Sequence, residues 1–221
     1  PFVKGTISQM GNDRKVFFIG CRGSGTALLG RALSRHWRQK VENSLGKPLN
    51  NGKEPVIDEF SPFVVMGIDA PRGAPDAPIR VERTPEYTLK AALLADIFPD
   101  AKFIHLVRDG KQNVEAMLKS GLNKEWANDF GEACTAWKDH ILAGLACERL
   151  HPGRVLRIGH DDLMRDVGGE LDRLLEFIDL EPADDNDCLL DMGLPESMAE
   201  DAQGWPENWN REQKSMFTSL C

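Results

Sequence analysis

Residues 15–26 read KVFFIGCRGSGT, and this stretch decides the expected architecture. The apolar run Lys15–Gly20 predicts a strand, and the glycine-rich turn after it leads into Thr26–Lys40, which has helical character. Glycines let a backbone close around an anion, and a helix N-terminus offers unpaired N–H groups with a partial positive charge. The sequence therefore predicts a strand–loop–helix unit suited to a phosphate-like group. A glycine turn without a ligand is the alternative.

The loop lacks the lysine that nucleotide triphosphatases use. Their version of this loop ends in Gly-Lys followed by Ser or Thr, and its lysine reaches the outer phosphates. The corresponding residues here are Gly25, Thr26 and Ala27. An ordinary ATPase or kinase is therefore disfavoured, and a kinase with this type of loop stands only as a third hypothesis.

Strands and helices alternate along the rest of the chain. Strands are expected at Ile79–Glu82, Lys102–Val107 and Val155–Gly159, and Phe63–Ile68 fits either a strand or a buried helical turn. Helices are expected from Thr84, as a hydroxyl N-cap before Pro85, to Phe98, and then at Lys111–Ser120, Asp129–Leu150, Gly169–Ile178 and Arg211–Leu220. This alternation predicts an α/β fold with a mainly parallel sheet flanked by helices.

Size and charge limit the classes of function. The 221 residues predict a single domain over 1–221, with a core at about 15–180 and an acidic C-terminal segment at 181–221. A formal charge of −8 disfavours nucleic acid as a partner, and no apolar run reaches the length of a membrane segment. Five cysteines without a CxxC spacing favour a reducing, cytoplasmic setting, although the chain begins Pro-Phe-Val and a leader outside it is conceivable. The oligomeric state is left open.

Four segments, in order, resemble one enzyme family. Residues 98–109 (FPDAKFIHLVRD) resemble the strand-and-arginine segment of sulfotransferases that use 3′-phosphoadenosine-5′-phosphosulfate (PAPS), and residues 18–29 (FIGCRGSGTALL) resemble their first motif. Residues 83–85 (RTP) are similar to the Lys-x-Pro segment of bacterial and Golgi-type members, and residues 154–163 (RVLRIGHDDL) to their RVLVVRYEDL segment. The resemblance spans about residues 15–180 and implies the P-loop-type fold of that family.

The resemblance also implies a reaction. A sulfuryl group would pass from PAPS to a hydroxyl or amine of a small-molecule or glycan acceptor, leaving 3′-phosphoadenosine-5′-phosphate (PAP), with no metal. Arg108 would bind the 3′-phosphate, and the transferred group would be stabilised by Arg22 and Arg83. A base from the next segment would be Glu54 or Glu59, with Asp58 as a third candidate. The donor-binding loop would consist of Arg22, Gly23, Ser24, Gly25, Thr26 and Ala27.

Three positions depart from the family pattern. Gly23 stands where the family usually has a cation, Ala116 stands eight residues after Arg108 where it often has a serine, and Arg83 replaces a lysine. Gly23 and Ala116 support an alternative hypothesis, a catalytically weak nucleotide-binding protein of the same fold.

Two further residues near these motifs have competing interpretations. His160 either faces the site or supports the turn that contains it. Cys21 lies in the loop near a helix start, where thiolates are stabilised, which leaves a minor redox hypothesis.

Overall fold

The structure is a computed structural model that describes residues 14–33, 66–68, 79–82, 84–121, 127–180 and 204–221. Within these residues the strands form one five-stranded sheet with the order β2-β3-β1-β4-β5. Four strands are parallel, namely β1 (Arg14–Gly20), β3 (Ile79–Glu82), β4 (Lys102–Val107) and β5 (Val155–Gly159). The edge strand β2 (Met66–Ile68) runs antiparallel to β3. The predicted α/β fold with a mainly parallel sheet is confirmed.

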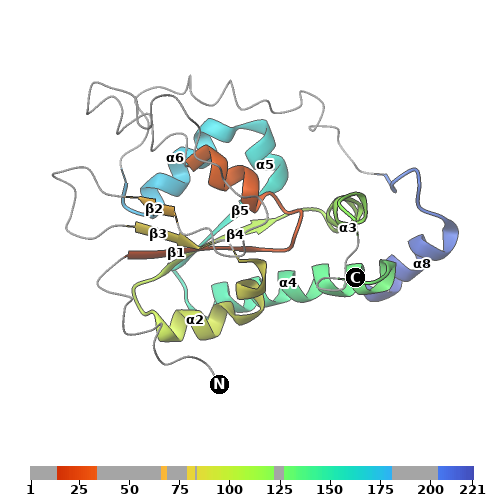
Figure 1. Cartoon of the computed structure of the whole chain (residues 1–221), viewed down its shortest axis with the longest axis horizontal. Coiled ribbons are helices and arrows are strands. Elements are labelled where there is room, and N and C mark those ends of the chain that lie inside the picture. The colour runs from red at the N-terminus through yellow and green to blue at the C-terminus, as the bar shows by residue number, and fades with distance from the viewer. Residues whose placement is uncertain (1–13, 34–65, 69–78, 83, 122–126, 181–203) are drawn as a thin grey trace.

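Helices cover both faces of this sheet (Figure 1). One face carries the helix of residues 26–33, α5 (His160–Arg165) and α6 (Val167–Phe177). The other face carries α2 (Ala91–Ile97) and the long helix α4 (Phe130–Leu150). Beyond the carboxyl ends of the strands lie α3 (Gly110–Lys119) and α8 (Arg211–Leu220). Because ligands of parallel sheets bind at the carboxyl ends of strands, this edge is the place to look for a site.

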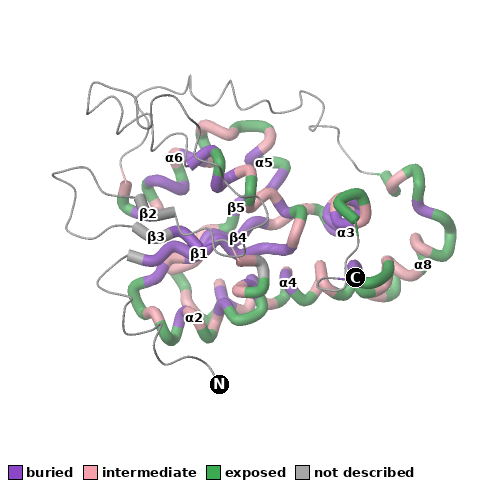
Figure 2. The backbone as a smooth tube through the Cα atoms, in the orientation of Figure 1, coloured by how far each residue is buried: buried purple, intermediate pink, exposed green. Residues whose placement is uncertain are grey.

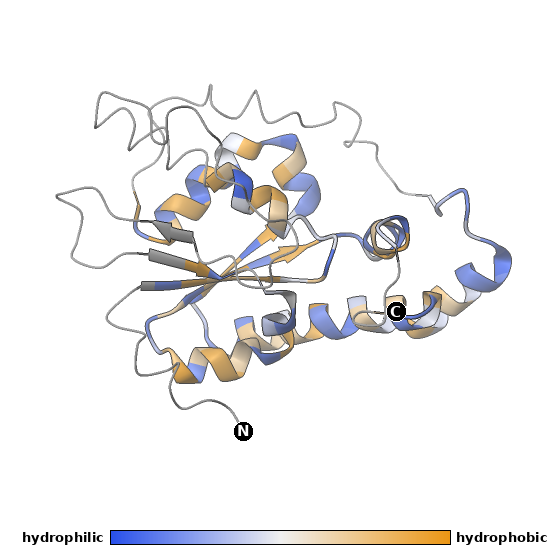
Figure 3. Ribbon diagram, viewed as in Figure 1, coloured by the Kyte–Doolittle hydropathy of each residue, from blue (hydrophilic) through white to orange (hydrophobic). Residues whose placement is uncertain are grey.

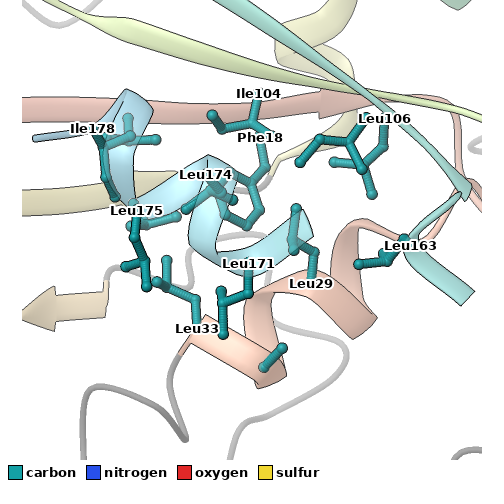
Figure 4. Close-up of a cluster of buried hydrophobic side chains, with 14 residues drawn as sticks. Phe18, Leu29, Leu33, Ile104, Leu106, Leu163, Leu171, Leu174, Leu175 and Ile178 are labelled. Carbon is teal, nitrogen blue, oxygen red and sulfur yellow. The ribbon is translucent and has the colours of Figure 1, made fainter. Parts of the chain in front are cut away.

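Two apolar cores separate the sheet from its helices. Neighbouring side chains of a strand point to opposite faces, so Phe18 enters one core and Phe17 the other. Phe18 packs with Leu29, Leu174 and other residues of the helix at 26–33 and of α6 (Figure 4). On the opposite face the Phe17 ring stacks on the Phe103 ring with centroids 5.1 Å apart. Strands β1 and β4, at the centre of the sheet, are accordingly buried along most of their length (Figure 2).

Side-chain caps begin the helices near the carboxyl edge. The Asp109 carboxylate accepts a hydrogen bond from the Gln112 N–H at the start of α3, and the Asp129 carboxylate caps α4 in the same way. Asn210 and Gln213 form a reciprocal capping box at the start of α8. None of the described helices is both long and apolar enough to span a membrane.

The predicted helix from Thr84 to Phe98 differs in two details. Its first part is a 3-10 helix, η2 (Pro85–Lys90). Thr84 is its N-cap residue, as predicted, but the Thr84 hydroxyl makes no capping hydrogen bond. The second part is α2, which buries Ala91 and Ala95 while Leu93 and Ile97 stay about half exposed, and it is coloured largely as hydrophobic in Figure 3. The 3-10 turn places the Thr88 hydroxyl against the end of β1, a tertiary contact that local sequence rules do not contain.

Candidate functional site

The loop after β1 has a backbone that requires glycine. Gly23 and Gly25 have φ angles of +84° and +106°, which side-chain-bearing residues rarely adopt. A Cβ added to Gly23 would lie 3.2 Å from the Ala116 Cβ, and one added to Gly25 would lie 3.1 Å from the His160 Cδ2. The two glycines therefore let α3 and α5 approach the loop closely from two sides.

Polar groups in this loop suit an anion. The helix after it begins at Thr26, and the first N–H of this segment paired with a backbone carbonyl is that of Leu29, which donates to Gly25. The N–H groups of the first turn, Thr26 to Leu28, have no acceptor within the helix, which leaves a partial positive charge there. The Ser24 hydroxyl is buried and has no hydrogen-bond partner among the residues that the structure describes. A buried orphan hydroxyl beside a helix N-terminus fits a phosphate or sulfonate oxygen.

One N–H of the predicted donor-binding loop forms a hydrogen bond within the loop itself. The Ser24 N–H donates to the Cys21 carbonyl over 3.1 Å, which closes a tight turn. The Ser24 N–H therefore shapes the loop and is not left for a ligand. The first-turn N–H groups and the Ser24 side chain are among the donors that the turn leaves for a ligand.

Arg108 lies against this loop, although 85 residues separate it from Gly23. Its Nη1 donates to the Gly23 carbonyl oxygen over 2.9 Å, and its Nε donates to the Gln112 side chain over 3.3 Å. Partial burial lowers the pKa of Arg108 below its ordinary value, an effect that the charges of Asp161 and Asp109 oppose. The structure thus brings the predicted loop and the predicted arginine together at one edge of the sheet.

Helix α3 holds the loop from the other side. The Asn113 amide donates to the Arg22 carbonyl oxygen over 2.7 Å. One turn further on, Ala116 faces Gly23, at the close approach already described. The position that carries a serine in the family pattern is therefore next to the loop and to the residue that Arg108 holds.

His160 and Thr88 are two site-adjacent residues that the sequence did not assign. The His160 ring is buried against Gly25, and its Nδ1 lies 3.4 Å from Asp161 Oδ1. Burial lowers the pKa of His160, the charge of Arg108 lowers it further, and Asp161 opposes both. Of the two interpretations of His160, facing the site or supporting its own turn, the structure supports the first, because the ring lies beside the loop. Thr88 is fully buried and bonds to both backbone groups of Gly20, at the start of the loop.

Burial decides against the redox hypothesis for Cys21. Its thiol is 1% exposed, and burial raises its pKa to about 12, even though Asn113 and the Arg22 backbone act in the opposite direction. A thiol with that pKa is protonated near neutral pH and is a poor nucleophile. The helix start that suggested a stabilised thiolate comes only at Thr26, after the turn.

Several predicted residues lie outside the part of the chain that the structure describes. These are Arg83, the candidate bases Glu54 and Glu59, and Asp58. Arg22 is described and partly buried, and its carbonyl is held by Asn113. Among the described residues no group of His, Cys, Asp or Glu is arranged to hold a metal ion.

Comparison with known proteins gives one consistent result. The sequence pattern of the Sulfotransferase family matches residues 38–185, a region that includes Arg108 and His160 and begins after the loop. Protein-tyrosine sulfotransferase A of Caenorhabditis elegans is 28% identical over 144 residues, which is 63% of this chain and 35% of that protein. This chain thus spans about a third of the length of that curated relative.

Two solved structures share the fold. The sulfotransferase domain of the Synechococcus PCC 7002 olefin synthase superposes with a TM-score of 0.56 at 17% identity, covering 94% of each chain. The sulfotransferase domain from the curacin biosynthetic pathway gives a TM-score of 0.53 at 16% identity, covering 80% of this chain and 77% of that one. With a family pattern matched over most of its length, the chain belongs to the sulfotransferase family.

Proposed function

We propose that this protein transfers a sulfuryl group from PAPS to a hydroxyl or amine of an acceptor and releases PAP. The observation that carries the proposal is the contact between the Arg108 guanidinium and the Gly23 carbonyl. It sets a fixed cation beside an anion-binding loop, and a nucleotide with phosphates at both its 5′ and 3′ positions needs two such groups close together. A plain 5′-nucleotide needs only the loop.

Different residues would bind the two phosphate groups of the donor. The first-turn N–H groups of Thr26 to Leu28 and the buried Ser24 hydroxyl suit the 5′ side, where fixed donors meet a phosphate or sulfonate. The Arg108 guanidinium suits the 3′-phosphate, since hydrogen bonds between two charged groups are the strong ones. Arg108 would then hold the loop and the nucleotide at once.

The chemistry would depend on position and charge. PAPS supplies a sulfur whose bond to the 5′-phosphate oxygen breaks as its bond to the acceptor oxygen or nitrogen forms. The helix N-terminus at Thr26, together with Arg22 and Arg83, would stabilise the negative charge that builds on the phosphate and on the sulfuryl oxygens. A carboxylate, with Glu54 and Glu59 as candidates, would take the acceptor proton.

A second hypothesis is a nucleotide-binding protein of the same fold with little catalysis. It rests on Gly23, which carries no cation toward the sulfuryl group and is fixed by its φ of +84° and by the contact with Ala116. Ala116 itself lacks the hydroxyl that shares the 3′-phosphate in the family pattern. Both hypotheses predict binding of PAP, and only the first predicts transfer.

Two measurements separate these hypotheses and the kinase alternative. In thermal-shift experiments, PAP at about 100 times its dissociation constant should stabilise the protein by about 2.7 kcal/mol without metal, whereas ATP with magnesium should have little effect. Incubation with ³⁵S-labelled PAPS and a panel of acceptors should then yield labelled product. Binding of PAP without transfer to any acceptor would favour the second hypothesis. A response to ATP and magnesium alone would contradict both.

A further inference from the structure

A cleft of about 600 Å³ opens behind the donor loop, on the side of the sheet covered by α4. It lies between η2, α3, the first half of α4 and the end of α8. Cys21 of the loop and Met117 of α3 form part of its wall, with their sulfur atoms 3.8 Å apart. The cleft therefore borders the donor loop at Cys21, its first residue. Glu86, at its edge, follows the Arg83-Thr84-Pro85 motif directly.

The charged residues among the described lining of this cleft are all acidic. Four carboxylates, those of Glu86, Asp129, Glu132 and Asp139, line it, and the described lining residues include no lysine or arginine. Two of the four are occupied by the start of α4, where Asp129 accepts from the Glu132 N–H and Glu132 accepts from Asn128. The other two, Glu86 and Asp139, are exposed and accept no hydrogen bond from any described residue.

His140 gives a second and independent indication of a ligand. It lines the cleft, yet its side chain is buried, with only 6% of the residue exposed. Its Nδ1 lies 2.7 Å from the Ala136 carbonyl oxygen, to which it donates a hydrogen bond, and in the neutral ring Nε2 is then an acceptor. Nε2 is buried and has no partner in the described structure. Buried polar atoms are normally paired, so an unpaired acceptor on a residue that lines this cleft points to a ligand that donates a hydrogen bond.

We propose that this cleft receives the acceptor and that the acceptor carries a cationic amine. The inference rests on the proposed function and narrows its acceptor class. An ammonium group has hydrogen-bond donors and no acceptor, which matches the carboxylates and His140 Nε2 together. An acidic peptide or a sulfated glycan would be repelled by the same four carboxylates. A small hydroxyl compound with an amine is the acceptor type that fits.

Three phenols of similar size and different charge test this proposal. Tyramine is cationic, 4-ethylphenol is neutral and 4-hydroxyphenylacetate is anionic, while all three present the same hydroxyl. Dissociation constants in the presence of saturating PAP, measured by ligand-observed NMR, should increase in that order, with tyramine about tenfold tighter than 4-hydroxyphenylacetate at low salt. The difference should shrink as salt rises from about 20 mM to about 500 mM, since the Debye length falls below the spacing of the charges.

The double variant Glu86→Gln/Asp139→Asn tests whether the amine binds in this cleft. It should reduce the ratio of tyramine to 4-ethylphenol affinity by about three- to tenfold, the range for two partly screened ion pairs. The control Asp100→Asn/Glu176→Gln removes the same two charges from exposed positions, before β4 and on α6, and should leave the ratio unchanged. Both pairs are exposed, so folding is not at risk.

These experiments test the cationic acceptor independently of the proposed sulfuryl transfer. Equal affinity of the wild-type protein for all three phenols, or an unchanged ratio in the Glu86/Asp139 variant, overturns the cationic acceptor. Because these are binding measurements, they stand even where no acceptor is sulfated, a result that would contradict the proposed function alone. Sulfation that prefers 4-hydroxyphenylacetate would support the function and overturn this inference.

Discussion

The hydroxyl of Thr88 bonds to both backbone groups of Gly20, accepting from its N–H over 2.8 Å and donating to its carbonyl oxygen over 3.1 Å. The described part of strand β3 pairs with β1 only as far as Phe17, and among the described residues no strand pairs with Gly20 on that side. The Thr88 side chain takes the place of the missing strand. It thereby fixes the point at which β1 becomes the donor loop.

Replacing this hydroxyl should disturb the loop and the stability together. Thr88→Val keeps the shape and leaves two buried backbone groups of Gly20 without their partner, so we expect a loss of about 1–3 kcal/mol in the free energy of unfolding. PAP affinity should fall as well, because the loop loses its anchor. Thr88→Ser retains the hydroxyl and should keep most of both properties. Denaturant titration and calorimetry with PAP measure the two effects, and equal behaviour of the two variants would refute the anchoring role.

The sequence predicted what depends on local pattern. The apolar run of β4 and the helix that follows it are local features, and the structure has both of them. Thr88 was not predicted, because its partner Gly20 is 68 residues away and no local rule connects them. Cys21 was judged from its distance to a helix start, whereas the burial that sets its pKa comes from elements far along the chain.

In the candidate site, too, the sequence predicted the features that carry a motif and missed those that depend on tertiary packing. Loop and arginine were predicted from motifs, and the register of the parallel β1 and β4, in which Gly20 pairs with Leu106, explains why they meet. His160 was noticed but not assigned, because its side depends on how α5 packs. The acidic cleft was not anticipated, since Glu86 and Asp139 are more than 50 residues apart and carry no motif.

Arg108→Ala should remove the preference for a 3′-phosphate. A hydrogen bond between charged groups contributes about 1.5–3 kcal/mol, so PAP affinity should fall by about 10- to 100-fold. Because Arg108 also holds the Gly23 carbonyl, affinity for a 5′-nucleotide without the 3′-phosphate should fall too, but much less. The ratio of the two dissociation constants is the decisive quantity. Arg108→Lys keeps the charge but lacks the planar set of guanidinium N–H donors, so its ratio should lie between those of the wild type and Arg108→Ala. An unchanged ratio in Arg108→Ala means that the 3′-phosphate is bound elsewhere.

His160 should make nucleotide binding depend on pH. In the free protein, burial and the charge of Arg108 hold the pKa of His160 below its ordinary value, while Asp161 acts in the opposite direction. An anion in the loop favours the imidazolium, so binding takes up a proton and PAP affinity rises as pH falls through the ordinary histidine range near 6.5. The depressed pKa also means that the free protein loses stability as pH falls below that range.

Proton uptake distinguishes this effect from the titration of the nucleotide. Calorimetry in two buffers with different ionisation enthalpies gives the number of protons bound with PAP at each pH. The phosphates of PAP contribute their own protons equally in wild type and in His160→Asn, which keeps a polar group but does not titrate. The variant should bind fewer protons and show a flatter pH profile. Identical uptake by the two proteins would place His160 outside the reach of the bound nucleotide.

The last prediction concerns the two departures that meet at Gly23. Ala116 faces it at a projected Cβ separation of 3.2 Å, beside the carbonyl that Arg108 holds. Ala116→Ser adds a hydroxyl at a partly buried helical position, and we expect PAP to bind about three- to tenfold more tightly, the value of about one net hydrogen bond. Gly23→Arg restores a cation but forces a side chain onto a φ of +84° and against Ala116, so it should cost about 1–3 kcal/mol of stability. Titration with PAP and thermal unfolding test both variants. A gain from Gly23→Arg without loss of stability would mean that the loop tolerates a side chain there, and the same PAP affinity in Ala116→Ser would mean that this helix does not face the 3′-phosphate.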